Sequence, residues 1–197
     1  MSAAAKKLNT IDTTQRYTYA DYATWPDEPR FELINGEAFE MSAPSRAHQK
    51  ISMTLSVQLG SYLRGKKCEV YAAPFDVRIN YNKADNTVVQ PDLLIICDLE
   101  KIENGKHCLG APDMVIEIVS ESTRRMDRVK KLNIYMEAGV REYWMVYPED
   151  KTVDVLILEN GKYFLTGYES DGIIPAQVLE GCKINLSDIF EPEEETD

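Results

Sequence analysis

Three polar residues stand at positions where a packed fold would ordinarily avoid charge. Asp92 directly precedes an apolar run, Leu93–Ile96, and Glu117 interrupts another, Met114–Val119. Lys131 lies fourteen residues after Glu117, in a charged stretch with helical spacing. Two carboxylates and an ammonium are the components of a magnesium-dependent phosphodiesterase site. Phosphodiester hydrolysis, the reaction of a nuclease, is therefore the leading hypothesis.

Glu117 occupies a strand position at which a charge is costly. Val115 and Val119, two residues away on either side, share its face of the strand. An ionised carboxylate buried there needs a cation or hydrogen bonds to compensate for lost hydration. An isolated glutamate in a strand is more often a structural residue paired with an arginine. A second carboxylate at a matching position favours a metal site instead.

Asp92 is that second carboxylate. Pro91 has no backbone donor and suits the start of a strand, so Asp92 lies beside Glu117 if the two strands are neighbours. The alternative is a turn aspartate, which commonly follows proline. Two adjacent carboxylates suit magnesium, which takes one or two protein carboxylates and keeps several waters.

Lys131 completes the set from a helix. Asp127, Lys131 and Tyr135 are spaced four residues apart and line one helical face. On the helix alone, a solvated charged surface is the more common reading of such a stripe. Beside a carboxylate pair, the ammonium would instead orient a nucleophilic water or stabilise charge in the transition state. A different, apolar face is expected to pack on the sheet: Val129, Leu132 and Met136.

Turn and capping residues divide the chain into strands and helices. Asn-Gly pairs predict hairpins over 30–41 and over 153–168. Ser45 is expected to cap a helix that ends near Arg64, and Ser122 or Thr123 a helix that ends at Ala138. Further strands are predicted between and after these helices: Cys68–Ala72, Phe75–Ile79, Val88–Cys97, Met114–Val119 and Glu142–Tyr147.

These elements predict one α/β domain of the mixed α+β kind, with a mixed central β-sheet flanked by helices and extended by β-hairpins. The runs Leu93–Ile96 and Met114–Val119 are apolar on both faces, as is typical of central strands. The domain is expected to span 17–190, after a mobile polar arm at 1–16 and before an acidic tail at 191–197.

Net charge weighs against a nucleic-acid substrate. The chain has 22 basic and 33 acidic residues, a formal charge of −11, whereas proteins that bind phosphates usually carry the opposite sign. Part of the excess lies in the last ten residues, where six are acidic. Four other basic residues lie within the seven positions before Lys131: Arg124, Arg125, Arg128 and Lys130. This distribution of charge weakens the argument against a nucleic-acid substrate but does not remove it.

The cysteines and the apolar runs predict a cytoplasmic protein. No C-x-x-C pair is present, so reduced thiols are expected rather than a zinc site. No secretory signal is recognised at the start of the sequence. No apolar run approaches the roughly 18–20 residues of a membrane span, so no membrane partner is expected. The four cysteines are Cys68, Cys97, Cys108 and Cys182.

The order of several short segments resembles the Uma-two family of endonucleases, within the PD-(D/E)XK nuclease superfamily. The resemblance extends from about Tyr17 to Phe190. Each segment alone is weakly specific, but their order and spacing together are fairly specific. They are Phe31–Glu37, Met41–Pro44 with His48, Val89–Asp92, Pro112–Ser120, Ser122-Thr123, Asp127 with Lys131 and Tyr135, and Ala138–Trp144.

The resemblance implies a restriction-endonuclease-like core and metal-dependent phosphodiester hydrolysis. Asp92 and Glu117 match the two acidic residues of the superfamily motif, which bind Mg²⁺, with Mn²⁺ as a substitute. The motif lysine is expected at position 119, where this chain has Val119. A lysine displaced onto the following helix points to Lys131.

The family pattern also implies supporting residues. It brings Glu32 and His48 to the site, with Gln90 beside Asp92 and Asp127 beside Lys131. A lone histidine in a first helical turn is, however, more often a surface or capping contact.

Three functions remain open at this stage. The favoured one is a magnesium-dependent endonuclease that hydrolyses DNA, and cutting two strands favours a homodimer. The alternative is a catalytically silent nuclease-like fold that acts as a binding or regulatory protein, which the acidic charge favours. A hydrolase of small phosphorylated compounds would tolerate that charge, but the sequence offers no phosphate-binding loop.

Overall fold

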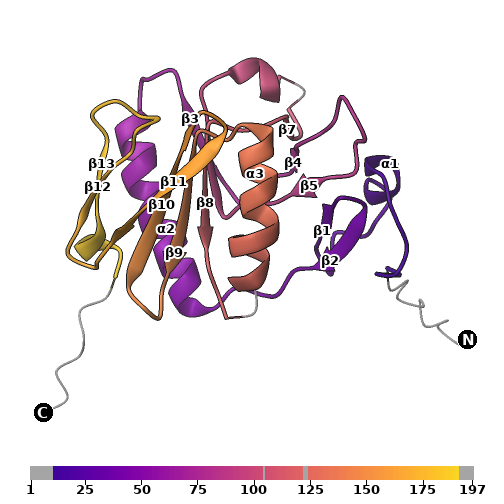
Figure 1. Ribbon diagram of the computed structural model, residues 1–197, viewed down its shortest axis with the longest axis horizontal. Helices are drawn as coiled ribbons and strands as arrows, with labels where there is room; N and C mark the ends of the chain where they lie inside the picture. Colours follow the sequence, from indigo (N-terminus) through magenta and orange to yellow (C-terminus); the bar gives the residue numbers. More distant parts are fainter. Residues whose placement is uncertain (1–10, 104, 122–123, 191–197) are drawn as a thin grey trace, which may run out of the picture.

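A mixed six-stranded β-sheet forms the centre of the molecule and has a helix on each face (Figure 1). The computed structural model describes residues 11–103, 105–121 and 124–190. The predicted tail, 191–197, and most of the predicted arm lie outside these ranges. Of the arm, residues 11–16 are described, and there Arg16 pairs with Glu37 at 2.9 Å.

The six strands lie in the order β11-β10-β9-β8-β6-β3. Only β8 and β9 run parallel, and the other neighbours are antiparallel. The prediction of a mixed sheet is therefore confirmed. The strands are β3 (Glu69–Ala72), β6 (Leu93–Ile96), β8 (Met114–Ile118), β9 (Glu142–Tyr147), β10 (Thr152–Glu159) and β11 (Lys162–Tyr168).

The central strands β6 and β8 are buried on both faces, as their apolar runs predict. Leu93 and Ile95 point to one core, and Leu94 and Ile96 point to the other. The first core is closed by α2 (Arg46–Leu63) and by a C-terminal segment containing β12 (Ile173–Pro175), β13 (Lys183–Asn185) and η3 (Leu186–Asp188). The second core is closed by α3 (Leu132–Ala138) and by a smaller sheet.

The smaller sheet has the strand order β2-β1-β5-β4-β7. Its first hairpin turns at Asn35 and Gly36, whose φ angles are 50° and 82°, as an Asn-Gly turn requires. Two short helices lie outside the sheets, α1 (Tyr19–Tyr22) and η1 (Leu99–Ile102). The strands are β1 (Phe31–Ile34), β2 (Glu37–Glu40), β4 (Val77–Arg78), β5 (Val88–Val89) and β7 (Cys108–Leu109).

The segment Val88–Cys97 is not one strand, as the sequence predicts, but two strands in different sheets. β5 pairs with β1 and β4 in the small sheet, whereas β6 pairs with β3 and β8 in the large one. The chain crosses between them at residues 90–92, where Pro91 removes a backbone donor from the ladder. Asp92 therefore lies at the junction of the two sheets.

The helix before β9 buries its polar stripe, so the apolar packing face predicted from Val129, Leu132 and Met136 is wrong for Val129, whereas Leu132 does pack against the second core. It comprises a π-helical segment, η2 (Met126–Lys131), followed by α3 (Leu132–Ala138), and Gly139 ends it with φ 88°. Val129 is 53 % exposed, whereas Asp127, Lys131 and Tyr135 are buried. Hydrogen bonds and ion pairs beneath the helix compensate the buried charges. The predicted caps, Ser122 and Thr123, lie outside the described residues.

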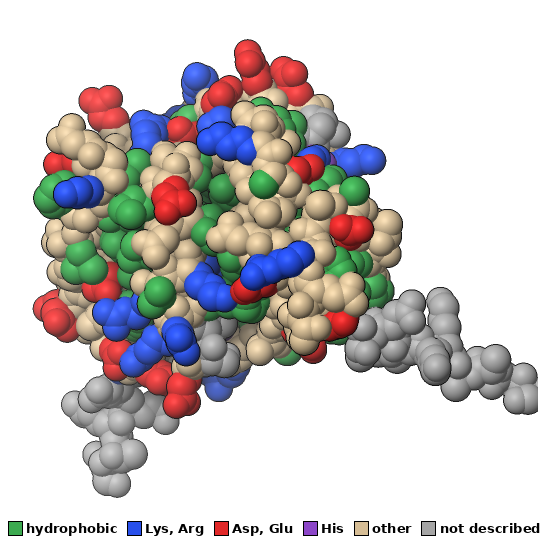
Figure 2. Space-filling model, turned by 45° about the vertical axis from the view of Figure 1, so that its right-hand side comes forward, with side chains coloured by type: hydrophobic (Ala, Val, Ile, Leu, Met, Phe, Trp, Pro, Cys, Tyr) green, Lys and Arg blue, Asp and Glu red, His purple; other side chains and the backbone are tan. Residues whose placement is uncertain are grey.

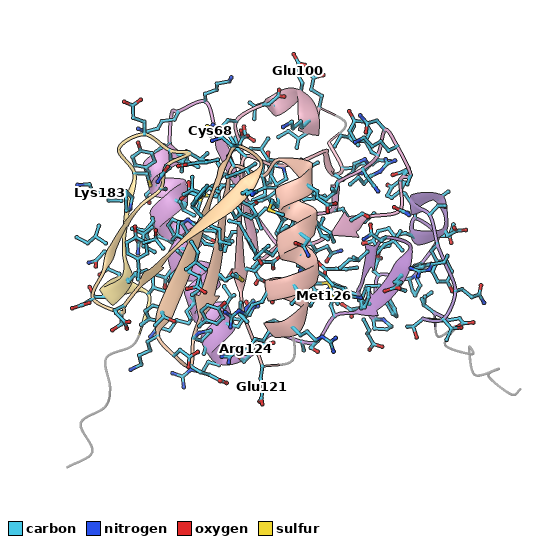
Figure 3. All side chains as sticks on the ribbon, in the orientation of Figure 1. Cys68, Glu100, Glu121, Arg124, Met126 and Lys183 are labelled. Carbon is cyan, nitrogen blue, oxygen red and sulfur yellow. A yellow bond between two sulfur atoms is a disulfide. The ribbon has the colours of Figure 1, made fainter. Side chains whose placement is uncertain are left out.

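Two cysteines form a disulfide, so the prediction of four reduced thiols is wrong for Cys68 and Cys97. The register of β3 against β6 pairs Glu69 with Ile96 and thereby places Cys68 opposite Cys97. Figure 3 labels Cys68, which directly precedes the first residue of β3. Cys108 and Cys182 are free and buried. Among the described residues, none of the helices has the length and apolar character needed to cross a bilayer.

Candidate active site

A cleft of about 550 Å³ opens where the two sheets, the start of α2 and η2 meet. Figure 3 shows Met126, which lines the cleft, at the start of the helix that faces the β1–β2 hairpin. All seven residues predicted to form or support the site line this cleft: Glu32, His48, Gln90, Asp92, Glu117, Asp127 and Lys131. They come from five different parts of the chain, so the fold rather than a local motif assembles them.

Asp92 and Glu117 are neighbours across the β6–β8 ladder. The last registered pair is Leu93 with Ile116, so the next position places Asp92 opposite Glu117. Oδ2 of Asp92 accepts a hydrogen bond of 2.7 Å from the backbone N–H of Ile118. This bond turns the aspartate toward β8 and fixes it beside the glutamate.

Lys131 is enclosed by carboxylates. Its Nζ lies 2.9 Å from Oε1 of Glu32, 3.0 Å from Oε1 of Glu117 and 3.7 Å from Oδ1 of Asp127. The lysine is 5 % exposed and Glu117 is 4 % exposed. Such buried charges are tolerated only when they are paired and hydrogen-bonded, and here each one is.

Burial and neighbouring charge shift the pKa values of both buried partners. Burial raises the pKa of Glu117, and the carboxylates of Asp127, Asp92 and Glu32 add to the effect, while Lys131 opposes it. Burial alone would lower the pKa of Lys131, but the surrounding carboxylates outweigh it and raise that pKa. The lysine is therefore a permanent cation at neutral pH.

His48 reaches the site from the first turn of α2. The hydroxyl of Ser45 accepts from the His48 backbone N–H at 3.2 Å, as predicted for a capping residue. The ring Nε2 lies 3.1 Å from Oδ2 of Asp92. Nδ1 is buried and has no hydrogen-bond partner among the described residues. The helix cap thus positions an imidazole against the aspartate.

Glu32 and Gln90 connect the site to the smaller sheet. The backbone N–H of Gln90 donates to Oε1 of Glu32 at 2.9 Å, the same oxygen that contacts Lys131. The side-chain amide of Gln90 points elsewhere, to Asp76 at 2.9 Å and to Tyr22 at 3.2 Å. Gln90 therefore contacts Glu32 through its backbone N–H, whereas its side chain bonds Asp76 and Tyr22.

Tyr135 belongs to the cluster, although the sequence predicts it only as part of the helical stripe. Its hydroxyl donates to Oε1 of Glu117 at 2.7 Å, and the residue is completely buried. Burial raises the pKa of Tyr135, and Glu117 adds to that shift, so the phenol remains a proton donor. In the sequence, the spacing of four residues between Lys131 and Tyr135 was the feature that pointed to a place for Tyr135 in the cluster.

The donor set fits one divalent cation bound by few protein ligands. Asp92 engages Oδ2 and Glu117 engages Oε1 in the hydrogen bonds described above. Both residues line the cleft beside Ile118. Among the described residues, no group of three His, Cys, Asp or Glu side chains is arranged to hold a metal. Magnesium needs fewer, since it keeps several waters.

Two proteins are similar to this chain over most of its length, one in structure and one in sequence. A crystal structure described as "a putative nuclease belonging to DUF820", from Anabaena variabilis, superimposes with a TM-score of 0.72 over 88 % of this chain and 97 % of that one, at 18 % identity. The uncharacterized protein slr1290 of a Synechocystis strain is 25 % identical over 76 % of this chain and 79 % of its own length.

A phosphoenolpyruvate carboxylase of Yersinia enterocolitica is 28 % identical over 78 % of this chain, which spans only 18 % of that enzyme. Its activity is therefore not transferred here.

A family model covers nearly all of the described domain. The model of the Uma2 family, described as "Putative restriction endonuclease", matches residues 19–187. The match contains the two strand carboxylates, the buried lysine and every other residue predicted to support the site. The chain belongs to the Uma2 family of restriction-endonuclease-like proteins.

Proposed function

We propose that this protein is a metal-dependent endonuclease that hydrolyses phosphodiester bonds of DNA. The observation that carries the proposal is the convergence of Asp92 and Glu117, on adjacent strands, with the buried ammonium of Lys131 in one cleft. Family membership supports the nuclease class.

The residues divide into three roles. Asp92 and Glu117, with the backbone carbonyl of Ile118, would hold Mg²⁺ or Mn²⁺. A bound ion of this kind supplies Lewis-acid stabilisation of the phosphoryl oxygens and an activated water. Lys131 holds a proton and a fixed positive charge toward the reacting phosphate. His48 orients Asp92 through Nε2.

The remaining carboxylates keep the lysine in place. Glu32 and Asp127 flank Nζ at 2.9 Å and 3.7 Å, so the ammonium cannot swing out of the cleft without losing both partners. Such fixed charges act without reorganising during the reaction.

The surface charge limits how strongly DNA is attracted. Lys and Arg side chains lie interspersed with Asp and Glu on the face shown in Figure 2. Since non-specific affinity for DNA comes mainly from counterions displaced by basic side chains, we expect weak, salt-sensitive binding. A homodimer, which would allow both strands to be cut, remains a prediction.

Cleavage assays test the proposal directly. Purified protein is incubated with single-stranded and double-stranded DNA in Mg²⁺, Mn²⁺ or a chelator. We expect cutting only with metal, and its loss in Asp92→Asn and Glu117→Gln. Asp98→Asn and Glu137→Gln change exposed carboxylates outside the cleft and should cut normally. Absence of cutting by the unmodified protein with either ion would refute the proposal.

A silent nuclease-like fold is the second candidate, and two observations favour it. Lys131 is already satisfied by carboxylates, and the net charge is −11. A thermal shift on adding Mn²⁺ separates the candidates. A rise in melting temperature that Asp92→Asn abolishes supports the enzyme, whereas no rise in the unmodified protein supports the scaffold.

A further inference from the structure

A second cavity, of about 570 Å³, lies beside the cleft and is lined by aromatic side chains. Its volume falls within the range of about 300–1,000 Å³ that small-molecule sites usually have. Neither the family match nor the proposed catalytic roles account for it. We call it the aromatic pocket and define it by Tyr19, Tyr22, Trp25, Phe31, Asp76 and Gln90.

The aromatic rings form one connected group. Trp25 packs against Phe31 with ring centroids 5.6 Å apart and against Tyr22 at 5.3 Å. Tyr19 and Tyr22 stack at 6.2 Å. Tyr19, Tyr22 and Trp25 are only partly buried and line the cavity, and the guanidinium of Arg78 covers one face of Tyr19 at 3.5 Å from the ring centroid. Flat heteroaromatic groups bind such surfaces by stacking.

Polar atoms in the pocket suit a ligand that donates hydrogen bonds. Gln90 is 9 % exposed, and its Oε1 is buried without a hydrogen-bond partner among the described residues. Its Nε2 donates to Oδ1 of Asp76 and to the hydroxyl of Tyr22, which fixes the amide. An unpaired buried acceptor is costly, and an N–H group of a bound ligand would satisfy it.

Acidic residues make the pocket a poor site for phosphate. Asp27 and Glu28 line it together with Asp76, although Arg30 and Lys106 offset part of this charge. Carboxylates accept hydrogen bonds from the N–H groups of nucleobases but repel phosphate oxygens. Aromatic surface combined with acceptors therefore favours a base over the backbone of a nucleic acid.

Gln90 joins the aromatic pocket to the catalytic cleft. It lines both cavities, as Arg30 does, and its backbone N–H bonds Oε1 of Glu32, which also contacts Lys131. A nucleotide with its phosphate in the cleft therefore has the pocket beside it. A base inside a duplex cannot enter without leaving the stack.

We propose that the aromatic pocket binds an unpaired nucleobase next to the phosphate to be cut, so that the preferred substrate is single-stranded or locally unpaired nucleic acid. This proposal rests on the nuclease function proposed above. Stacking on aromatic side chains tolerates any base, so the pocket confers a preference for strand state rather than for sequence.

The test measures binding without metal, where no cutting occurs. A fluorescently labelled single-stranded oligo(dA) is titrated with the full-length protein in a chelator, and anisotropy is recorded. The comparison strands are the matched duplex and a strand of the same length made of abasic residues. We expect the base-bearing single strand to bind at least about tenfold more tightly than either.

Substitutions in the aromatic pocket test whether its side chains bind the single strand. Trp25→Ala and Tyr19→Ala should each weaken this binding by about tenfold or more, and Trp25→Phe should retain most of it. Tyr81→Ala, at an exposed ring outside both cavities, is the matched control. If circular dichroism shows that Trp25→Ala does not fold, Tyr19→Ala tests the pocket in its place.

The outcomes separate this proposal from the nuclease function. Unchanged affinity in both alanine variants, or equal affinity for the abasic strand, overturns the base-binding site even where metal-dependent cutting is observed. Trp25-dependent binding without any cutting supports the pocket as a base site while the nuclease function fails. Trp25-dependent binding together with a higher rate of cutting on single strands supports both.

Discussion

The ammonium of Lys131 lies 3.0 Å from Oε1 of Glu117, and both side chains are almost completely removed from solvent. Tyr135 donates to the same oxygen at 2.7 Å. The glutamate thus binds two buried side chains through one oxygen while the residue also lines the cleft. This arrangement allows one residue to serve both the stability of the core and the binding of a cation.

Removal of the ammonium is expected to destabilise the protein. In Lys131→Ala, three carboxylates lose their shared partner, and breaking a buried ion pair in this way costs about 3–5 kcal/mol. The free energy of unfolding, measured with urea, should fall by that amount. The burial of Lys131 is the reason that a substantial loss is expected.

Lys130→Ala is the matched control, because Lys130 is half exposed and pairs with Glu37 at the surface. Its expected effect is below about 1 kcal/mol. Equal losses in the two variants would contradict the buried-cluster argument.

His48→Ala should weaken metal binding without removing a proposed ligand. His48 holds Asp92 at 3.1 Å through Nε2, and loss of such an outer partner typically costs about 10–100-fold in affinity or activity. The apparent affinity for Mn²⁺ can be read from the rise in melting temperature with metal concentration. Lys50→Ala, on the same helix but exposed, should leave the affinity unchanged, and a similar loss there would argue against a specific role for the imidazole.

Stability should fall at alkaline pH. Burial raises the pKa of Tyr135 and of Tyr143 above the ordinary value of 10.0. A folded-state pKa above the unfolded one means that the stabilisation is complete below about pH 10 and is lost as the pH rises toward the folded-state pKa. The free energy of unfolding should decline by up to about 1.4 kcal/mol per pH unit for each buried tyrosine.

Urea titrations between about pH 8 and about pH 11.5 measure this slope. Tyr143→Phe should reduce it, while Tyr81→Phe, at an exposed ring, should not. A slope that is the same in all three proteins would show that ionisation of the buried phenols is not its source.

Reduction of the disulfide should destabilise the large sheet. Cys68 and Cys97 are 29 residues apart, and closing a loop of this length stabilises a fold by about 3–4 kcal/mol in the chain-entropy model. Dithiothreitol should lower the free energy of unfolding of the unmodified protein but have no effect on Cys68→Ser. Cys182→Ser removes a free thiol and should keep the response, so a response in Cys68→Ser would assign the effect to another group.

Local signals predicted the hairpins and the first long helix well. The Asn35-Gly36 turn and the Ser45 cap depend on residues within a few positions of one another. The strands β6 and β8 were also predictable, because both faces of each are apolar.

The features of the fold that could not be predicted from the sequence depend on contacts between residues far apart in the chain. The division of Val88–Cys97 between two sheets depends on partners far away in the chain. The inward face of the helix at Lys131 depends on Glu32, a residue of the first hairpin. The opposition of Cys68 and Cys97 follows from the register of β3 on β6, which composition does not reveal.

The crossing of the chain from one sheet to the other at residues 90–92 has a consequence for folding. Glu32 belongs to the small sheet and Glu117 to the large one, while Gln90 and Asp92 flank the crossing itself. A chain with all its strands formed but its two sheets apart would have no ion cluster and no cleft. During refolding, recovery of metal binding should therefore lag behind recovery of β-structure and report the moment at which the two sheets dock.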